Sequence, residues 1–219
     1  MKLSRWYGRF RGWAVAAGAL LLSGCAPDFN WREVHGPKGD YRVMFPSKPA
    51  SMTRDIQLGD LPVPMTMQGA RVNEIRFTVA VATLPDADPG TRQKALAWMR
   101  AGMLRNIAAK DEKTASSLVT LIDAQGVARG RAPAIQIDAR GSINGKPARM
   151  LAGFAALGSS AYQWVVIGPS LPEEQARIFI DSFRLVPVPA SQAGALGSPS
   201  KAVRQAPAND PVPGKGSSN

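Results

Sequence analysis

Ala161-Tyr162-Gln163-Trp164-Val165-Val166-Ile167 is the stretch that decides the fold. Apart from Gln163, apolar side chains occupy both alternating sets of positions, whereas a strand with one solvated face alternates apolar and polar residues. The segment therefore predicts a central strand over residues 161–168 that is covered on both faces. The rest of the domain is expected to be arranged around this strand.

Further strand patterns lie on both sides of this segment along the chain. Tyr41, Val43 and Phe45 alternate with other residues before Pro46 ends the run, and residues 74–84 alternate in the same way. The Asn144-Gly145 pair predicts a tight hairpin, because both residue types tolerate positive φ. The predicted strands are 41–45, 50–58, 63–72, 74–84, 117–124, 134–142, 146–157 and 161–168.

Two amphipathic helices are predicted between and after these strands. Asp88 can cap the first, which extends over about residues 88–110. Its apolar stripe consists of Leu96, Met99, Met103 and Ile107. The second helix begins at Leu171, with Ser170 and Glu173 as a capping box. Its stripe consists of Ala176, Phe179, Ile180 and Phe183.

Strands, helix, strands and helix with mostly antiparallel neighbours indicate an α+β fold. The Tyr-x-Val-x-Phe-Pro opening at 41–46, and the ending at 161–166 followed by 179–185, resemble the PsbP-like superfamily. This resemblance covers about residues 31–186 and implies an α/β/α sandwich, in which two main helices flank a mostly antiparallel sheet. It also implies a protein of mostly non-enzymatic type, such as an adaptor, an accessory subunit or an envelope lipoprotein.

The first 24 residues have the composition of a signal peptide. Basic residues precede an apolar run at 13–22, which is shorter than the about 20 residues that a membrane-spanning helix needs. Leu22-Ser23-Gly24-Cys25 then resembles a bacterial lipobox, in which small residues precede the cysteine that becomes acylated. The sequence therefore predicts a lipoprotein signal peptide over 1–24 and a short tether over 25–30. A plain signal peptide with an unrelated Cys25, or a short buried helix, are the alternatives.

Charge and cysteine content agree with an exported protein. Cys25 is the only cysteine, so the chain has no internal disulfide. The formal charge is +11, and removing the four basic residues of the leader leaves +7, which favours anionic surfaces such as phospholipid or lipopolysaccharide. Position 26 is Ala and not Asp, which by resemblance indicates the periplasmic face of the outer membrane. No nucleic acid partner is expected.

The last part of the chain differs from the domain before it. Residues 187–219 contain six Pro, four Gly, five Ser and no aromatic residue. Such a composition buries too little apolar surface to offset the entropy of ordering. The sequence predicts a disordered tail here, after a domain over 31–186.

No catalytic set is recognisable. His35 is the only histidine and lies in a turn near the tether, and no nucleophile elbow or phosphate-binding glycine loop accompanies it. A structural zinc site needs several Cys, His or carboxylate ligands, and the chain has one Cys and one His. The sequence therefore predicts a protein that is not an enzyme and has no cofactor.

Methionine is the remaining signal. Met65 and Met67, two residues apart on a predicted strand, would face the same side and contact an apolar ligand or Cu(I). The plain alternative is that both fill gaps in the core.

The sequence thus favours a lipid-anchored envelope protein that acts as an interaction or accessory module and has an envelope protein as its partner. The alternative is a periplasmic protein that binds an apolar ligand, a lipid or Cu(I). The sequence defines neither the specific partner nor the oligomeric state.

Overall fold

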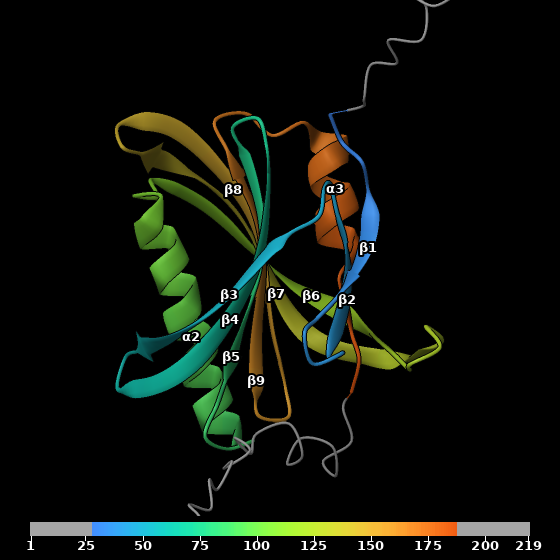
Figure 1. Ribbon diagram of the computed structural model, residues 1–219. Helices are drawn as coiled ribbons and strands as arrows, with labels where there is room; N and C mark the ends of the chain where they lie inside the picture. Colours follow the sequence, from blue (N-terminus) through green and yellow to red (C-terminus); the bar gives the residue numbers. More distant parts are fainter. Residues whose placement is uncertain (1–27, 188–219) are drawn as a thin grey trace, which may run out of the picture. The chain divides into compact units, whose positions relative to one another are not determined.

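The computed structural model of the chain describes residues 28–187 (Figure 1). The predicted lipobox at 22–25 and almost all of the predicted tail at 187–219 lie outside the described residues. Within this range, 56% of the residues form strands and 18% form helices. Neither of the helices in 28–187 combines the length and the apolar character that crossing a bilayer requires.

Ten strands and two helices follow one another along the described chain. In order they are β1 (Arg32–His35), β2 (Tyr41–Phe45), β3 (Ala50–Leu58), β4 (Leu61–Val72), β5 (Ile75–Thr83), α2 (Pro89–Asn106), β6 (Asp111–Ile122), β7 (Ala128–Ile143), β8 (Lys146–Leu157), β9 (Ser160–Gly168), α3 (Glu173–Ser182) and β10 (Arg184–Leu185).

All ten strands belong to one sheet with the order β1-β2-β10-β6-β7-β8-β9-β5-β4-β3. Neighbours are antiparallel, except that β10 and β6 run parallel. The sheet curls into a half-barrel (Figure 1). Long strands favour this curvature, because each strand twists and the twist accumulates across neighbours. The predicted central strand is confirmed as β9, which lies between β8 and β5 and is buried along most of its length.

The two faces of the sheet carry different cores. On one face, α3 packs against β2, β8 and β9 through aromatic residues: Phe179 contacts Phe45 and Phe77, with ring centroids 5.3 Å apart in both pairs. On the other face, α2 packs its Ala95 and Met99 against side chains of the sheet that include Met150 and Ala152.

Gly153 shows how closely the aromatic core is packed. A Cβ at this position of β8 would lie 2.1 Å from the Trp164 ring, which crosses the glycine from β9. The Trp164 ring in turn stacks on Phe183, with centroids 4.2 Å apart. The indole Nε1 of Trp164 donates a hydrogen bond to the Ile180 carbonyl at 3.2 Å. These contacts fix the end of α3 on the sheet.

The predicted fold class, an α+β fold of the α/β/α sandwich type with two main flanking helices, is wrong. The chain forms one mixed, curled sheet with more than half of the described residues in strands. The alternation of apolar and polar residues in a strand predicts which side chains face a core. It does not specify how strongly the sheet curves, and this curvature decides whether helices can cover a whole face of the sheet. The PsbP-like resemblance rested on such core patterns, and its implied architecture is therefore corrected.

Several predicted element boundaries agree with the structure, whereas those in polar, exposed segments do not. Strands over 41–45, 50–58 and 146–157 are confirmed, and Asp88 caps α2 through hydrogen bonds from the backbone of Gly90 and Thr91. The hairpin turn is confirmed, with φ of 51° at Asn144 and 77° at Gly145. In contrast, β6 and β7 begin six residues before the predicted strands, in polar and mostly exposed sequence. The strands β1 and β10 were not predicted.

The predicted capping box at the start of α3 is wrong. Pro172 occupies the N-cap position of this helix, and no side chain caps it. The Glu173 carboxylate instead binds two arginines.

Candidate functional site

Strand β6 has a long edge without a partner. On one side it pairs with β7 from Asp111 to Ile122, but on the other side it pairs with β10 only at Thr120 and Leu121. Within residues 28–187, the edge over 111–119 therefore has no neighbouring strand. Unpaired N–H and C=O groups along such an edge form a template for another extended chain.

A groove lies beside this edge, between α3 and the strands that α3 does not cover. One hollow of about 210 Å³ is lined by Lys113 and Ala115 of β6 and by Glu173 and Arg177 of α3, among others. A second of about 390 Å³ includes residues 117–120 and shares Gln136, Ile180 and Asp181 with the first. We call these two hollows together the α3–β6 groove. It exists because α3 packs on β2, β8 and β9 while the curled sheet carries β6 and β7 away from it.

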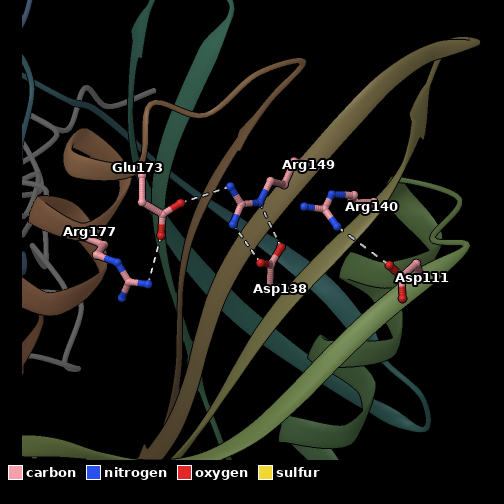
Figure 2. A network of polar contacts seen from close by, with 6 residues as sticks. All are labelled: Asp111, Asp138, Arg140, Arg149, Glu173 and Arg177. Atoms are coloured by element: carbon pink, nitrogen blue, oxygen red, sulfur yellow. Dashed lines mark hydrogen bonds and ion pairs between the residues drawn. The ribbon is translucent and has the colours of Figure 1, made fainter.

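A polar network spans the groove (Figure 2). Arg149 of β8 binds Asp138 of β7 through two parallel hydrogen bonds, Nε to Oδ1 at 3.0 Å and Nη2 to Oδ2 at 2.8 Å. Its Nη1 lies 3.2 Å from Glu173 Oε2, and Glu173 Oε1 lies 2.9 Å from Arg177 Nη2. The network therefore ties the first turn of α3 to the floor of the groove.

The network also sets the charge state of its members. Hydrogen bonds from Arg149 hold the pKa of Asp138 below its usual range, and this effect exceeds the opposing desolvation. The same hydrogen bonds raise the pKa of Arg149. Beside the network, Arg140 Nη1 and Asp111 Oδ2 lie 3.9 Å apart as an exposed pair. Both shifts favour the charged forms of Asp138 and Arg149.

The charged side chains of the first hollow are balanced, and small side chains border the free edge. Lys113, Arg149 and Arg177 face the acids Asp138, Glu173 and Asp181. Ala115 and Ser117 point no large group into the space beside the free edge. The second hollow adds Arg131 and Arg184, so the groove as a whole carries a small excess of positive charge.

The residues predicted from the sequence lie elsewhere. The lipobox residues Leu22, Ser23, Gly24 and Cys25 lie outside the described residues, so the lipidation site stays a prediction. Met65 and Met67 do face the same side of β4, toward α2: Met65 is 7% exposed in the core and Met67 packs partly against it. Neither lines the α3–β6 groove. The prediction that they bind an apolar ligand or Cu(I) stays a prediction.

His35 lies on the exposed edge strand β1. Its Nε2 is 3.0 Å from Glu33 Oε1. In the part of the chain that the structure describes, no three His, Cys, Asp or Glu side chains are grouped closely enough to hold a metal ion.

One buried carboxylate stands apart from these groups. Asp40, between β1 and β2, is 5% exposed, and its Oδ1 accepts no hydrogen bond from any described group. Desolvation raises the pKa of Asp40 above its ordinary value. A hollow of about 30 Å³ beside it is lined by Lys38 and Thr83, whose side chains are hydrogen-bonded to each other.

Sequence reasoning missed the groove and its network. The predicted strand begins only at residue 117, and the polar segment before it was not recognised as a strand. The signal that could have revealed it is weak: alternating exposed residues over 111–119 have no apolar face to mark them. The sequence matches no protein-family model, and no curated protein matches it significantly.

Proposed function

We propose that the protein is a lipid-anchored, non-enzymatic envelope protein that binds a partner protein in the α3–β6 groove. The partner contributes an extended segment that pairs with the edge of β6 over 111–119. The observation that carries this proposal is the free edge itself, nine residues long and bordered by an open groove. The anchor at Cys25 is supported by the Leu22-Ser23-Gly24-Cys25 motif and the basic, apolar leader before it.

Strand addition fits the chemistry of the groove. Main-chain hydrogen bonds along the β6 edge supply affinity without a charged ligand, and side-chain pockets between the edge and α3 supply specificity. Lys113 and Asp181 stand on opposite walls and are in no ion pair among the described residues, so each is free to meet a charge on the partner. Arg149, Asp138, Glu173 and Arg177 are already paired with one another.

Photo-crosslinking of the full chain in intact bacterial cells tests this function. A photoreactive residue is placed at Lys113 or Ser117 in the groove, and at Gln93 on the exposed side of α2 as the matched control. We expect both groove positions to give the same discrete adduct with one envelope protein, and Gln93 not to give it. Equal labelling from all three positions, or labelling of abundant neighbours only, would contradict strand addition at β6.

The anchor has a separate test. The Cys25→Ser variant is expected to lose incorporation of a labelled fatty acid and to leave the membrane fraction, because the acylated sulfur is removed. The unchanged chain is the control in the same cells. Persistent fatty acid labelling of Cys25→Ser would show that the lipobox interpretation is wrong.

A further inference from the structure

The described chain begins close to the predicted anchor. Two residues, Ala26 and Pro27, separate Cys25 from Asp28, so the three Cα–Cα steps between them span at most about 10 Å. From Phe29 onward the chain is held in place: the Phe29 ring stacks on Trp31 with centroids 5.9 Å apart, and both rings contact Phe77 edge-on. The Trp31 Nε1 also donates to Gln175 Oε1 of α3 at 3.2 Å. An anchor at Cys25 would therefore hold one particular end of the domain at the membrane.

That end carries a basic hollow. Arg71 of β4 is paired in register with Arg76 of β5, which directly precedes Phe77, and Lys146 opens β8 beside them. Together they line a hollow of about 210 Å³ at the β4–β5 and β7–β8 hairpins. Both hairpins lie at the same upper end of Figure 1 as the first described residues.

The three basic side chains are exposed and uncompensated. None of Arg71, Arg76 and Lys146 belongs to an ion pair among residues 28–187. Glu74 is the one acidic residue in the lining of this hollow, against three basic ones. Lys and Arg near an anionic bilayer are each attracted to its surface, and the attraction decays within a Debye length of about 8 Å at physiological salt. A tether of at most about 10 Å keeps the end of the domain that carries the hollow next to the surface in which Cys25 would be anchored.

We infer that the hollow formed by Arg71, Arg76 and Lys146 docks on the anionic phospholipid surface in which Cys25 is anchored. This inference rests on the proposed anchoring of Cys25 and adds an orientation to it. The β8–β9 turn at Ser159 then points away from the bilayer, because β8 extends about 36 Å from Lys146 to Leu157. The α3–β6 groove lies along the side of the domain and stays open to a partner.

The orientation is measured with the full, lipidated chain in vesicles. Because the acylated Cys25 has no free thiol, one added cysteine carries a fluorophore, either at Glu74→Cys beside the hollow or at Ser159→Cys at the opposite end. The vesicles contain phosphatidylglycerol and phosphatidylethanolamine, with a quencher in the headgroup region. We expect quenching to be about twofold or more stronger at position 74 than at position 159. This difference should fall when phosphatidylcholine replaces phosphatidylglycerol or when salt is raised.

A charge variant isolates the hollow. The triple change Arg71→Gln, Arg76→Gln and Lys146→Gln should reduce the difference between positions 74 and 159. The matched control neutralises three exposed basic residues elsewhere, Arg54→Gln, Lys94→Gln and Arg131→Gln, and should leave the difference unchanged.

The outcomes separate this inference from the proposed anchor. Equal quenching at both positions on a chain that stays vesicle-bound would overturn the orientation and leave the anchor intact. An equal loss in the control triple variant would also overturn it, because total charge and not the hollow would then be responsible. Loss of vesicle attachment in the unchanged, fully processed chain would instead contradict the anchor. The two triple variants alter exposed side chains only, and thermal unfolding verifies that both are folded.

Discussion

Strands β9 and β6 belong to the same sheet but differ in almost every respect. Both edges of β9 are paired, with β8 and β5, and helices pack on both of its faces. The first six residues of β6 are exposed, and its edge over 111–119 has no partner within residues 28–187. Stability is therefore concentrated around β9, while β6 offers groups that another chain can bind.

Side-chain composition explains this division. The segment of β9 carries Tyr162, Trp164 and Val166 toward α3 and Ala161 and Val165 toward α2, so both faces are apolar. The segment that opens β6, Asp111-Glu112-Lys113-Thr114-Ala115, offers neither face a large apolar group. It is held by the β7 ladder and by Arg100, whose Nη2 binds Glu112 Oε1 at 2.6 Å.

The largest expected effect comes from the core under β9. Phe179→Ala should lower the free energy of unfolding by about 3–5 kcal/mol, because Phe179 is fully buried between Phe45 and Phe77. Leu118→Ala on β6 is the control, since Leu118 is 57% exposed, and should change this free energy by about 0.5 kcal/mol or less. Urea unfolding measures both. Similar losses of unfolding free energy in the two variants would show that stability is not concentrated around β9.

This contrast also marks how far the sequence could predict the fold. Alternation at β2 and β5 predicted those strands, and the nearly continuous apolar run of β9 predicted its central position, because burial on both faces removes the polar positions. The polar starts of β6 and β7, the two-residue β10 and the curling of the sheet leave no such pattern. They depend on long-range pairing, such as Thr120 with Arg184, which no local segment encodes.

The candidate site could not be predicted from the sequence for a related reason. Asp138, Arg149 and Glu173 are far apart in sequence, and each is an ordinary surface residue in its own segment. Only the register of β7 on β8 and the placement of α3 bring them together. The lipobox, in contrast, is a contiguous motif that can be recognised without a fold.

The polar network should contribute less than the aromatic core. Arg149→Ala should cost about 1–2 kcal/mol of unfolding free energy, because it leaves Asp138 without its partner and Glu173 with Arg177 alone, although partial exposure weakens the effect. Since the pKa of Asp138 is lowered in the folded state, its contribution is present above its unfolded pKa of about 3.9 and is lost as the pH falls through the folded pKa. The difference between wild type and Arg149→Ala should therefore shrink below about pH 4.

Denaturant titrations from pH 7 to pH 3 measure this dependence. Arg140→Ala is the matched control, because Arg140 and Asp111 form an exposed pair 3.9 Å apart, and its effect should stay within about 0.5 kcal/mol. A loss for Arg149→Ala that is independent of pH would show that Asp138 does not carry the contribution.

The effect of Asp40 on stability depends on pH in the opposite direction to that of Asp138. Its folded pKa is raised, so the folded state binds this proton more tightly than the unfolded state. Wild type should therefore lose stability as the pH rises from the unfolded pKa of about 3.9 through the folded pKa. Asp40→Asn does not titrate at this position and should gain stability relative to wild type between pH 4 and pH 8, as thermal unfolding at both pH values will measure. The opposite trend would mean that groups around Asp40 stabilise its charged form.

The smallest effect on stability is expected at the β6 edge, together with the largest effect on binding. Ala115→Lys should change the free energy of unfolding by no more than about 0.5 kcal/mol, because Ala115 is exposed and lines the groove. A lysine beside an unpaired edge opposes the docking of another strand, so the adduct formed from Ser117 should disappear. Ala97→Lys, on the exposed side of α2, is the control and should retain the adduct. An adduct that survives Ala115→Lys would mean that the partner contacts Ser117 without pairing along β6, and the free edge would then be a gap in the sheet with no role in recognition.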